Sequence, residues 1–179
     1  MKGFALWGGS GPPPVPSSFT VQYTGALNTG AQTIGLTRSA AGSNYGWNLV
    51  GNPYASSIDW GAASGWTKTN VNNAIYLHVN ASTWASFVGG VATNGGSQYI
   101  APGQGFFVQV KDDGSTSGSL SVTNSVRVHN SASFFKNVSD LPVSNLVRLQ
   151  LSGNDYSDET VVRFLPEASA SFDGDYDAV

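Results

Sequence analysis

The sequence has no cysteine, and only 11% of its 179 residues are charged. Without cysteine there can be neither a disulfide framework nor a thiolate ligand for a metal, so the fold must be stabilised by its core. Because charged residues are few, neutral polar side chains must keep the protein soluble. Because 40% of the residues are apolar, with five Trp, seven Tyr and nine Phe, the chain can bury enough surface to fold. We therefore expect a folded protein with a sizeable core.

Two further absences exclude classes of partner. The formal net charge is −3, which is small and has the wrong sign for binding phosphate backbones or anionic lipid headgroups. No run of apolar residues approaches the roughly 20 that cross a bilayer as a helix. The sequence therefore predicts no nucleic-acid partner and no membrane insertion.

Short segments rich in Val, Ile, Thr and aromatic residues alternate with clusters of Gly, Asn and Ser, which is typical of many short antiparallel strands. No window shows a clear 3.6-residue apolar period, so little helix is expected. We predict one all-β domain over residues 1–179, an antiparallel, jelly-roll-like β-sandwich of about ten short strands. The predicted strands are Phe19–Thr24, Thr33–Arg38, Trp47–Gly51, Ala74–Val79, Trp84–Val88, Gly105–Val110, Ser119–Val128, Leu146–Leu151 and Thr160–Leu165.

The predicted strand Leu146–Leu151 shows the clearest alternation. Val147, Leu149 and Leu151 fall on one face, whereas Arg148 falls on the other. Successive side chains of a strand point to opposite faces of the sheet. We therefore expect a half-buried strand whose apolar face contacts the core.

Five short motifs occur together in one known family. They are Gly46–Tyr54 (GWNLVGNPY), Ser57–Trp60 (SIDW), Tyr99–Val108 (YIAPGQGFFV), Asp158–Phe164 (DETVVRF) and Phe172–Ala178 (FDGDYDA). Over nearly its whole length the chain resembles a β-rich module of large surface and secreted proteins of Bacteroidota. That module lies upstream of the C-terminal sorting domain read by the type IX secretion system. The resemblance implies a secreted or cell-surface location and a fragment of a larger modular protein, and it supplies no catalytic residues.

Four aromatic residues, Tyr54, Trp60, Trp66 and Trp84, lie in or beside polar, loop-like stretches. Flat Trp and Tyr faces can stack on pyranose rings while amide side chains bind sugar hydroxyls, but the same rings also fill β-sandwich cores. The pattern suggests a carbohydrate-binding surface, with core packing as the alternative. The amides that would accompany the rings are Asn72, Asn73 and Gln104.

The C-terminal end is acidic, with seven acidic residues and one base from Asp155 onward. Asp173, Asp175 and Asp177 alternate around a glycine, and Asp158 with Asp155 forms a second oxygen-rich cluster. Hard oxygen ligands at such spacing suit Ca²⁺. The sequence therefore suggests a structural calcium site, with a charged surface turn as the alternative.

Recognisable catalytic motifs are scarce. The two histidines, His78 and His129, are well separated, and neither a Gly-x-Ser-x-Gly elbow nor a phosphate-binding glycine loop occurs in the required setting. Glycoside hydrolysis needs two carboxylates, which Glu159, Glu167 and several aspartates could supply. We favour the alternative, a solvated acidic loop with further carboxylates at strand ends.

Three functions remain open at this point. The first is a non-catalytic accessory module of a secreted or cell-surface bacterial protein that binds a polysaccharide through exposed aromatics. The second is a structural spacer or adhesin domain whose partners are neighbouring domains of the parent protein. The third is a glycan-active enzyme. A binder is expected to expose at least two coplanar rings, whereas a spacer is expected to bury its tryptophans.

Overall fold

The computed structural model describes residues 1–4, 22, 24–80, 83–129, 144–153, 156–169 and 171–178. Within these ranges all strand pairs are antiparallel, and the helical structure is a single 3₁₀ turn at Asn124–Val126. The described part of the chain contains no helix long and apolar enough to cross a membrane. The predicted all-β class with little helix is confirmed.

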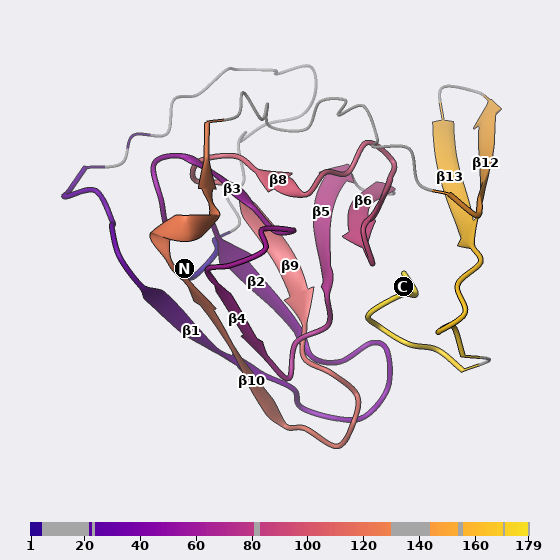
Figure 1. Cartoon of the computed structure of the whole chain (residues 1–179), viewed down its shortest axis with the longest axis horizontal. Helices are drawn as coiled ribbons and strands as arrows, with labels where there is room; N and C mark the ends of the chain where they lie inside the picture. The colour runs from indigo at the N-terminus through magenta and orange to yellow at the C-terminus, as the bar shows by residue number, and fades with distance from the viewer. Residues whose placement is uncertain are drawn as a thin grey trace, which may run out of the picture.

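One layer of the molecule is a five-stranded sheet (Figure 1). Its strands, in spatial order, are β2 (Trp47–Gly51), β9 (Gly105–Gln109), β5 (Ala74–Asn80), β6 (Thr83–Val88) and β7 (Val91–Thr93). β6 and β7 are joined by Gly89 and Gly90, whose φ values of +53° and +86° suit the tight two-residue turn of a twisted hairpin.

The opposing layer consists of two small sheets. The first has the order β1 (Gln32–Thr37), β10 (Ser117–Val122) and β4 (Trp66–Thr69), and the second has the order β11 (Arg127–Val128), β3 (Ser57–Asp59) and β8 (Tyr99–Ile100). β3, β4, β7 and β8, of two to four residues, were not among the predicted strands. Such short strands contain too few residues to show a period of two.

The core lies between the two layers. Val50, Phe106 and Val108 point inward from the five-stranded sheet, and Leu120 and Ile58 meet them from the opposing layer, all fully buried in one cluster. Burial of an apolar side chain of this size contributes about 1.5–3 kcal/mol. The predicted strand Gly105–Val110 corresponds to β9, and its face carrying Phe106 and Val108 is the one that contacts the core.

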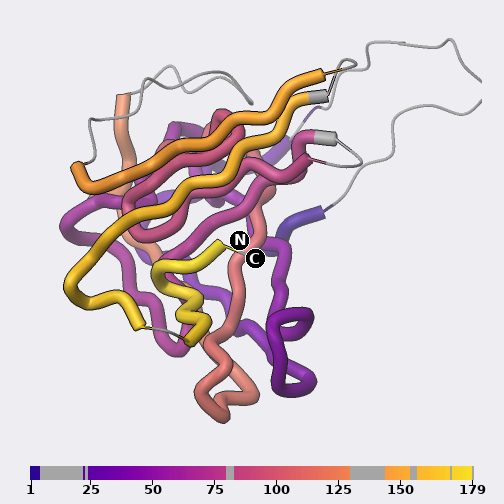
Figure 2. The backbone as a smooth tube through the Cα atoms, turned by 90° about the vertical axis from the view of Figure 1, so that its right-hand side faces the viewer, coloured from indigo at the N-terminus to yellow at the C-terminus, as the bar shows by residue number. Residues whose placement is uncertain are grey.

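A two-stranded hairpin stands outside the sandwich. β12 (Leu146–Gly153) and β13 (Tyr156–Arg163) pair along their whole length. In Figure 2 the hairpin runs alongside the β6–β7 region, and the C-terminal segment folds back toward the sandwich. These strands match the predicted Leu146–Leu151 and Thr160–Leu165, with longer bounds.

The predicted strand Ser119–Val128 is not continuous. β10 ends at Val122, and the 3₁₀ turn separates it from β11. The hydroxyl of Thr123 accepts a hydrogen bond from the backbone N–H of Ser125, which caps the turn and directs Val126 into the core. The alternation in this stretch comes from two strands and a capped turn. Of the predicted strand Phe19–Thr24, only residues 22 and 24 are described, so the structure does not test it.

Candidate functional site

An aromatic cluster covers the outer face of the five-stranded sheet, on the side away from the core. Tyr76 pairs with Phe107 across β5 and β9, and His78 pairs with Trp84 across β5 and β6. Trp47 packs beside Tyr76. Because these residues occupy the positions between the core residues of their strands, their rings share the outer face.

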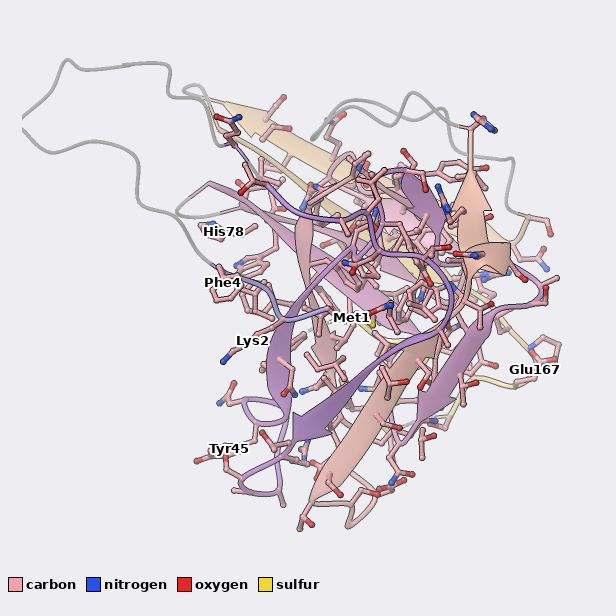
Figure 3. The ribbon with its side chains drawn as sticks, turned by 90° about the vertical axis from the view of Figure 1, so that its left-hand side faces the viewer. Met1, Lys2, Phe4, Tyr45, His78 and Glu167 are labelled. Carbon is pink, nitrogen blue, oxygen red and sulfur yellow. The ribbon has the colours of Figure 1, made fainter. Side chains whose placement is uncertain are left out.

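The rings of this cluster meet edge to face. The centroid of Trp84 lies 4.8 Å from that of His78 and 5.2 Å from that of Phe107, with interplanar angles of 63° and 75°. Trp84 remains 43% exposed, and Figure 3 shows His78 at the margin of the molecule. These pairs are not coplanar, so the cluster presents one exposed indole with aromatic walls rather than a flat platform.

Two of the aromatic residues predicted to bind sugar are buried instead. Tyr54 is 2% exposed and Trp60 is 1% exposed. The hydroxyl of Tyr54 donates to the carbonyl of Val122 at 3.1 Å, and the ring of Trp60 packs against Phe106 at a centroid distance of 6.1 Å. The expectation that Tyr54 and Trp60 stack on a ligand is therefore wrong, because both rings fill the space between the layers.

The remaining predicted residues are also bound within the fold. Trp66 is half-buried and donates its indole N–H to the carbonyl of Asp59 at 2.7 Å. Asn72 and Gln104 are each 7% exposed, and both amides are bonded internally. Asn73 is exposed and accepts a hydrogen bond from a lysine. Of the predicted sugar-binding rings, only Trp84 combines an aromatic face with substantial exposure.

Sequence reasoning missed four members of the outer-face cluster. Trp47, Tyr76, His78 and Phe107 were placed in strands, but the alternation within a strand does not show which of its two faces is covered by another layer. Trp84 was singled out because it adjoins a polar loop. The pairing of β5 with both β6 and β9 is what gathers the rings.

The β12–β13 hairpin covers the free edge of the five-stranded sheet. β7 is the last strand of that sheet, so half of its backbone groups have no neighbouring strand. Arg148 Nη1 donates to the carbonyl of Ala92 at 3.0 Å, and the N–H of Asn94 donates to Glu159 Oε1 at 3.2 Å. Arg148 and Glu159 also form an ion pair with each other. A pair of opposite charges thus occupies the place that a sixth strand would take.

The opposite face of the hairpin is apolar and open to solvent. The cross-strand register puts Val147 opposite Val162 and Leu149 opposite Thr160. The expectation that Val147, Leu149 and Leu151 face the core is therefore wrong: the polar face carrying Arg148 turns inward. The exposed apolar residues are Val147, Leu149, Leu151, Val162 and Phe164, with exposed fractions from 44% to 80%.

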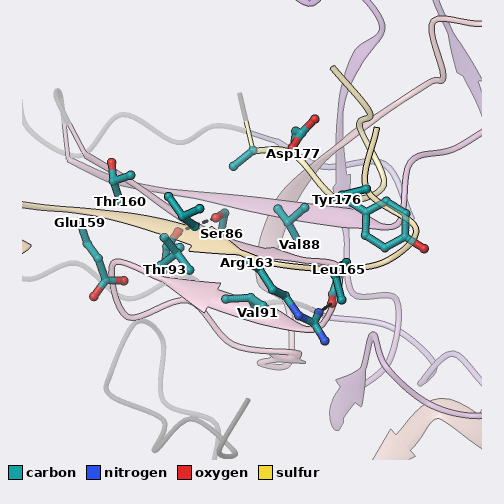
Figure 4. Close-up of a pocket in the computed structure, with 15 residues that line it drawn as sticks. Ser86, Val88, Val91, Thr93, Glu159, Thr160, Arg163, Leu165, Tyr176 and Asp177 are labelled. Atoms are coloured by element: carbon teal, nitrogen blue, oxygen red, sulfur yellow. Dashed lines mark hydrogen bonds between the residues drawn. The ribbon is translucent and has the colours of Figure 1, made fainter. Parts of the chain in front are cut away.

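A cavity of about 410 Å³ lies between β6, β7, β13 and the C-terminal segment (Figure 4). Its wall combines Val88 and Val91 with the hydroxyls of Ser86 and Thr93, which are hydrogen-bonded to each other at 2.6 Å. Arg163 Nη1 donates to a turn carbonyl, while its buried Nε has no partner among the described residues. The cavity thus combines apolar side chains with several hydrogen-bonding groups, which also include Thr160 and Tyr176.

The carboxylates considered for glycoside hydrolysis do not face one another across this cavity. Glu159 lines the cavity but is paired with Arg148, whereas Glu167 is not among the lining residues. Asp158 accepts hydrogen bonds from the Asn94 side chain and from a backbone N–H, which hold the pKa of its carboxyl below the usual value. These groups act as hydrogen-bond acceptors that attach the hairpin to the sandwich.

The acidic C-terminal loop is attached to the sandwich by one carboxylate. Asp175 Oδ1 accepts the backbone N–H of Asn73 at 2.6 Å, and its Oδ2 pairs with Lys111 Nζ at 2.5 Å, which raises the pKa of that lysine. The loop approaches so closely that a Cβ on Gly174 would lie 2.1 Å from the Nδ2 atom of Asn72. Glycine is therefore required at the centre of this motif.

The predicted calcium ligands are not gathered into one cluster within the described residues. No group of three or more acidic or histidine side chains suited to a metal occurs there. Asp173 and Asp177 accept backbone N–H groups of their own loop. Asp155 lies outside the described residues. Calcium binding remains a prediction of the sequence.

Replacing Asp175 distinguishes a loop that is attached by the Asp175 ion pair from a loop that binds calcium. We expect Asp175→Asn to lower the free energy of unfolding by about 1–2 kcal/mol, because a charge-assisted hydrogen bond and a half-exposed ion pair are lost. Urea unfolding with and without chelator measures this effect, with the exposed Glu167→Gln as the control. If chelator lowers the wild-type stability and has no effect on the variant, Asp175 is instead a calcium ligand.

Residues 2–179 match the model of a family described as a domain of unknown function, DUF8693. Neither the curated proteins nor the solved structures contain a match to the chain.

Proposed function

Because the chain belongs to the DUF8693 family, a domain of unknown function, we propose a role from its geometry. The protein is a non-catalytic structural module of a secreted or cell-surface protein. It packs against a neighbouring domain of that parent through the outer face of the β12–β13 hairpin. The location is proposed from the resemblance of its motifs to surface and secreted proteins.

The observation that carries the proposal is the orientation of the hairpin. Its charged face is fixed on the sandwich by Arg148 and Glu159, which leaves five large apolar side chains exposed on one side. Isolated two-stranded sheets are marginally stable in water, and a contiguous exposed apolar patch marks a site of association. Burial of each such side chain would contribute about 1.5–3 kcal/mol.

A neighbouring domain fits this surface better than a sugar does. The face consists of aliphatic side chains and one phenylalanine, whereas sugars need hydrogen-bonding groups beside the rings. The other contacts of the hairpin are internal: Arg163 donates to the carbonyl of Gly89, and the side chain of Asn94 donates to Asp158. The hairpin is thus held rigidly and displays its apolar side outward.

Cysteine labelling tests the proposal cleanly, since the chain has no cysteine of its own. We expect Leu149→Cys to react readily with a maleimide in the isolated chain. In the longer parent protein the rate should fall by at least about tenfold, because a packed neighbour restricts access to the thiol.

The matched control is Asp113→Cys, in an exposed loop away from the hairpin. Its labelling rate is expected to stay the same in both proteins. Equal labelling of Leu149→Cys in the isolated chain and in the parent would contradict packing at this face.

Carbohydrate binding is the second candidate, favoured by the exposed indole of Trp84 beside His78 and Phe107. Affinity electrophoresis against a panel of polysaccharides tests it. Trp84→Ala should weaken binding by about tenfold or more, because covering a large apolar side chain contributes about 1.5–3 kcal/mol. Tyr45→Ala, which removes an exposed ring elsewhere, should have no effect. Retention by none of the polysaccharides would reject this candidate.

A further inference from the structure

One lysine points into the sandwich from an edge strand. Lys68 lies on β4 opposite the buried Leu120 of β10, so its aliphatic stem runs along the core. Its ammonium group lies 3.7 Å from the centroid of the Trp60 ring and 3.3 Å from the carbonyl oxygen of the same residue. Lys68 Nζ also lies 2.7 Å from Oδ1 of Asn73.

The surroundings of Lys68 favour loss of its proton. Burial lowers the pKa of Lys68 to about 8, and the charges of Asp175 and Asp59 oppose this shift only in part. With that pKa, about one molecule in ten carries a neutral amine at pH 7. The Trp60 ring attracts the ammonium form and so reduces this fraction. Asp175 is itself paired with Lys111, which weakens its hold on the Lys68 charge.

The backbone of Asn73, which carries the amide next to this amine, is held in place. The backbone N–H of Asn73 donates to Asp175 Oδ1 at 2.6 Å, and its carbonyl accepts a long hydrogen bond from the N–H of Gly89 at 3.5 Å. The carbonyl carbon of the Asn73 side chain lies one covalent bond beyond the oxygen that Lys68 contacts. A nucleophile and a carbonyl fixed this close react with a large effective concentration.

We propose that Lys68 and Asn73 join in an intramolecular isopeptide bond. The lone pair of the neutral Nζ attacks Cγ of Asn73, the new Nζ–Cγ bond forms, and the Cγ–Nδ2 bond breaks. A proton from Nζ passes to the departing nitrogen, which leaves as ammonia. No oxidant or further reactant is needed. Asp175 acts as a positioning residue, because it holds the backbone of Asn73.

The bond would join the two layers of the sandwich where they approach each other. Lys68 belongs to the sheet of β1, β10 and β4, whereas Asn73 immediately precedes β5 of the five-stranded sheet. An inward-pointing lysine also protects an edge strand from pairing with another chain, and that role requires no covalent change. The mass of the protein distinguishes the two.

Intact mass spectrometry of the purified full chain is the test. After prolonged incubation at a pH above 8, wild type is expected to be lighter than its sequence mass by one ammonia molecule. Trypsin should fail to cleave after Lys68, because the modified side chain no longer carries a charge. Lys68→Arg and Asn73→Ala should both restore the full sequence mass. Compared with wild type at a pH well above 8, where Lys68 is mostly neutral in both proteins, Asp175→Asn should slow the loss of ammonia without abolishing it.

The exposed Lys2→Arg is the matched control and should still lose ammonia. The proposal is overturned if wild type keeps its full sequence mass and is cleaved after Lys68. It is equally overturned if Lys68→Arg still loses ammonia, because the loss would then come from another amide.

Discussion

Asn52→Ala is expected to lower the free energy of unfolding by about 3–5 kcal/mol. The Asn52 amide is buried and donates to the carbonyls of Ser56, Ile100 and Ala101 at 2.8, 3.2 and 3.0 Å. Its oxygen accepts the N–H of Tyr54 at 2.9 Å. Alanine leaves these groups without partners in a place that water reaches poorly, and each such group costs about 1–3 kcal/mol. Denaturant unfolding followed by tryptophan fluorescence measures the loss.

The control for this variant is Asn28→Ala. Asn28 also donates to a backbone carbonyl, that of Pro53 at 2.9 Å, but it is exposed. Water replaces its hydrogen bond, so we expect a change below about 1 kcal/mol. If the two variants were equally stable, the buried network around Asn52 would not be what joins the strands.

Asn52 also shows what the motifs that carry the family resemblance do in the fold. Its backbone N–H donates to the carbonyl of Gln104, and the Gln104 side chain accepts the N–H of Ala101. Gly46–Tyr54 and Tyr99–Val108 therefore interlock. Both motifs were identified in the sequence by their resemblance to a known family. The sequence does not show that they contact each other, because they lie about fifty residues apart in the chain.

The two C-terminal motifs likewise make contacts between elements. Within Asp158–Phe164, Glu159 and Arg163 attach the hairpin to the β6–β7 region. Within Phe172–Ala178, Asp175 attaches the loop to Asn73 and Lys111. Motifs that all serve internal attachment are what a structural module needs, and this supports the proposed function over a catalytic one.

The alternation of side chains predicted the strands well but not the environment of each face. The carbonyl of Ala92 and the N–H of Asn94 at the free edge of β7 attract the charged face of the hairpin. This contact turns the apolar face of β12 toward solvent. A pattern of period two is identical for both orientations, so only the tertiary contacts decide between them.

The sequence allowed core packing of the aromatic residues but did not show which of them are buried. Trp60 stands between Asp59 and Gly61, a polar setting that favoured exposure. It is buried because Trp66 and Phe106, from β4 and β9, pack against it at centroid distances of 4.9 and 6.1 Å. Trp84 has neighbours of a similar kind but no opposing layer over it, and it stays exposed.

A second large effect is expected at a buried arginine. Arg38 follows β1, and its guanidinium donates to the carbonyls of Tyr45, Val110 and Gly42 at 3.0, 2.8 and 2.6 Å. It also pairs with Asp112 at 2.9 Å, where the arginine side chain is 3% exposed and the carboxylate 39%. One cation thus holds the loop after β1 to the end of β9.

Arg38→Met keeps most of the buried stem but removes every donor and the charge. We expect the free energy of unfolding to fall by about 3–5 kcal/mol, because three carbonyls lose their donor and a buried charge interaction disappears. Asp112→Asn, which removes only the partly hydrated partner, should cost about 1 kcal/mol or less. Thermal and urea unfolding of both variants provides the comparison. A loss in Arg38→Met no larger than in Asp112→Asn would show that the ion pair, and not the carbonyl cluster, is the main role of Arg38.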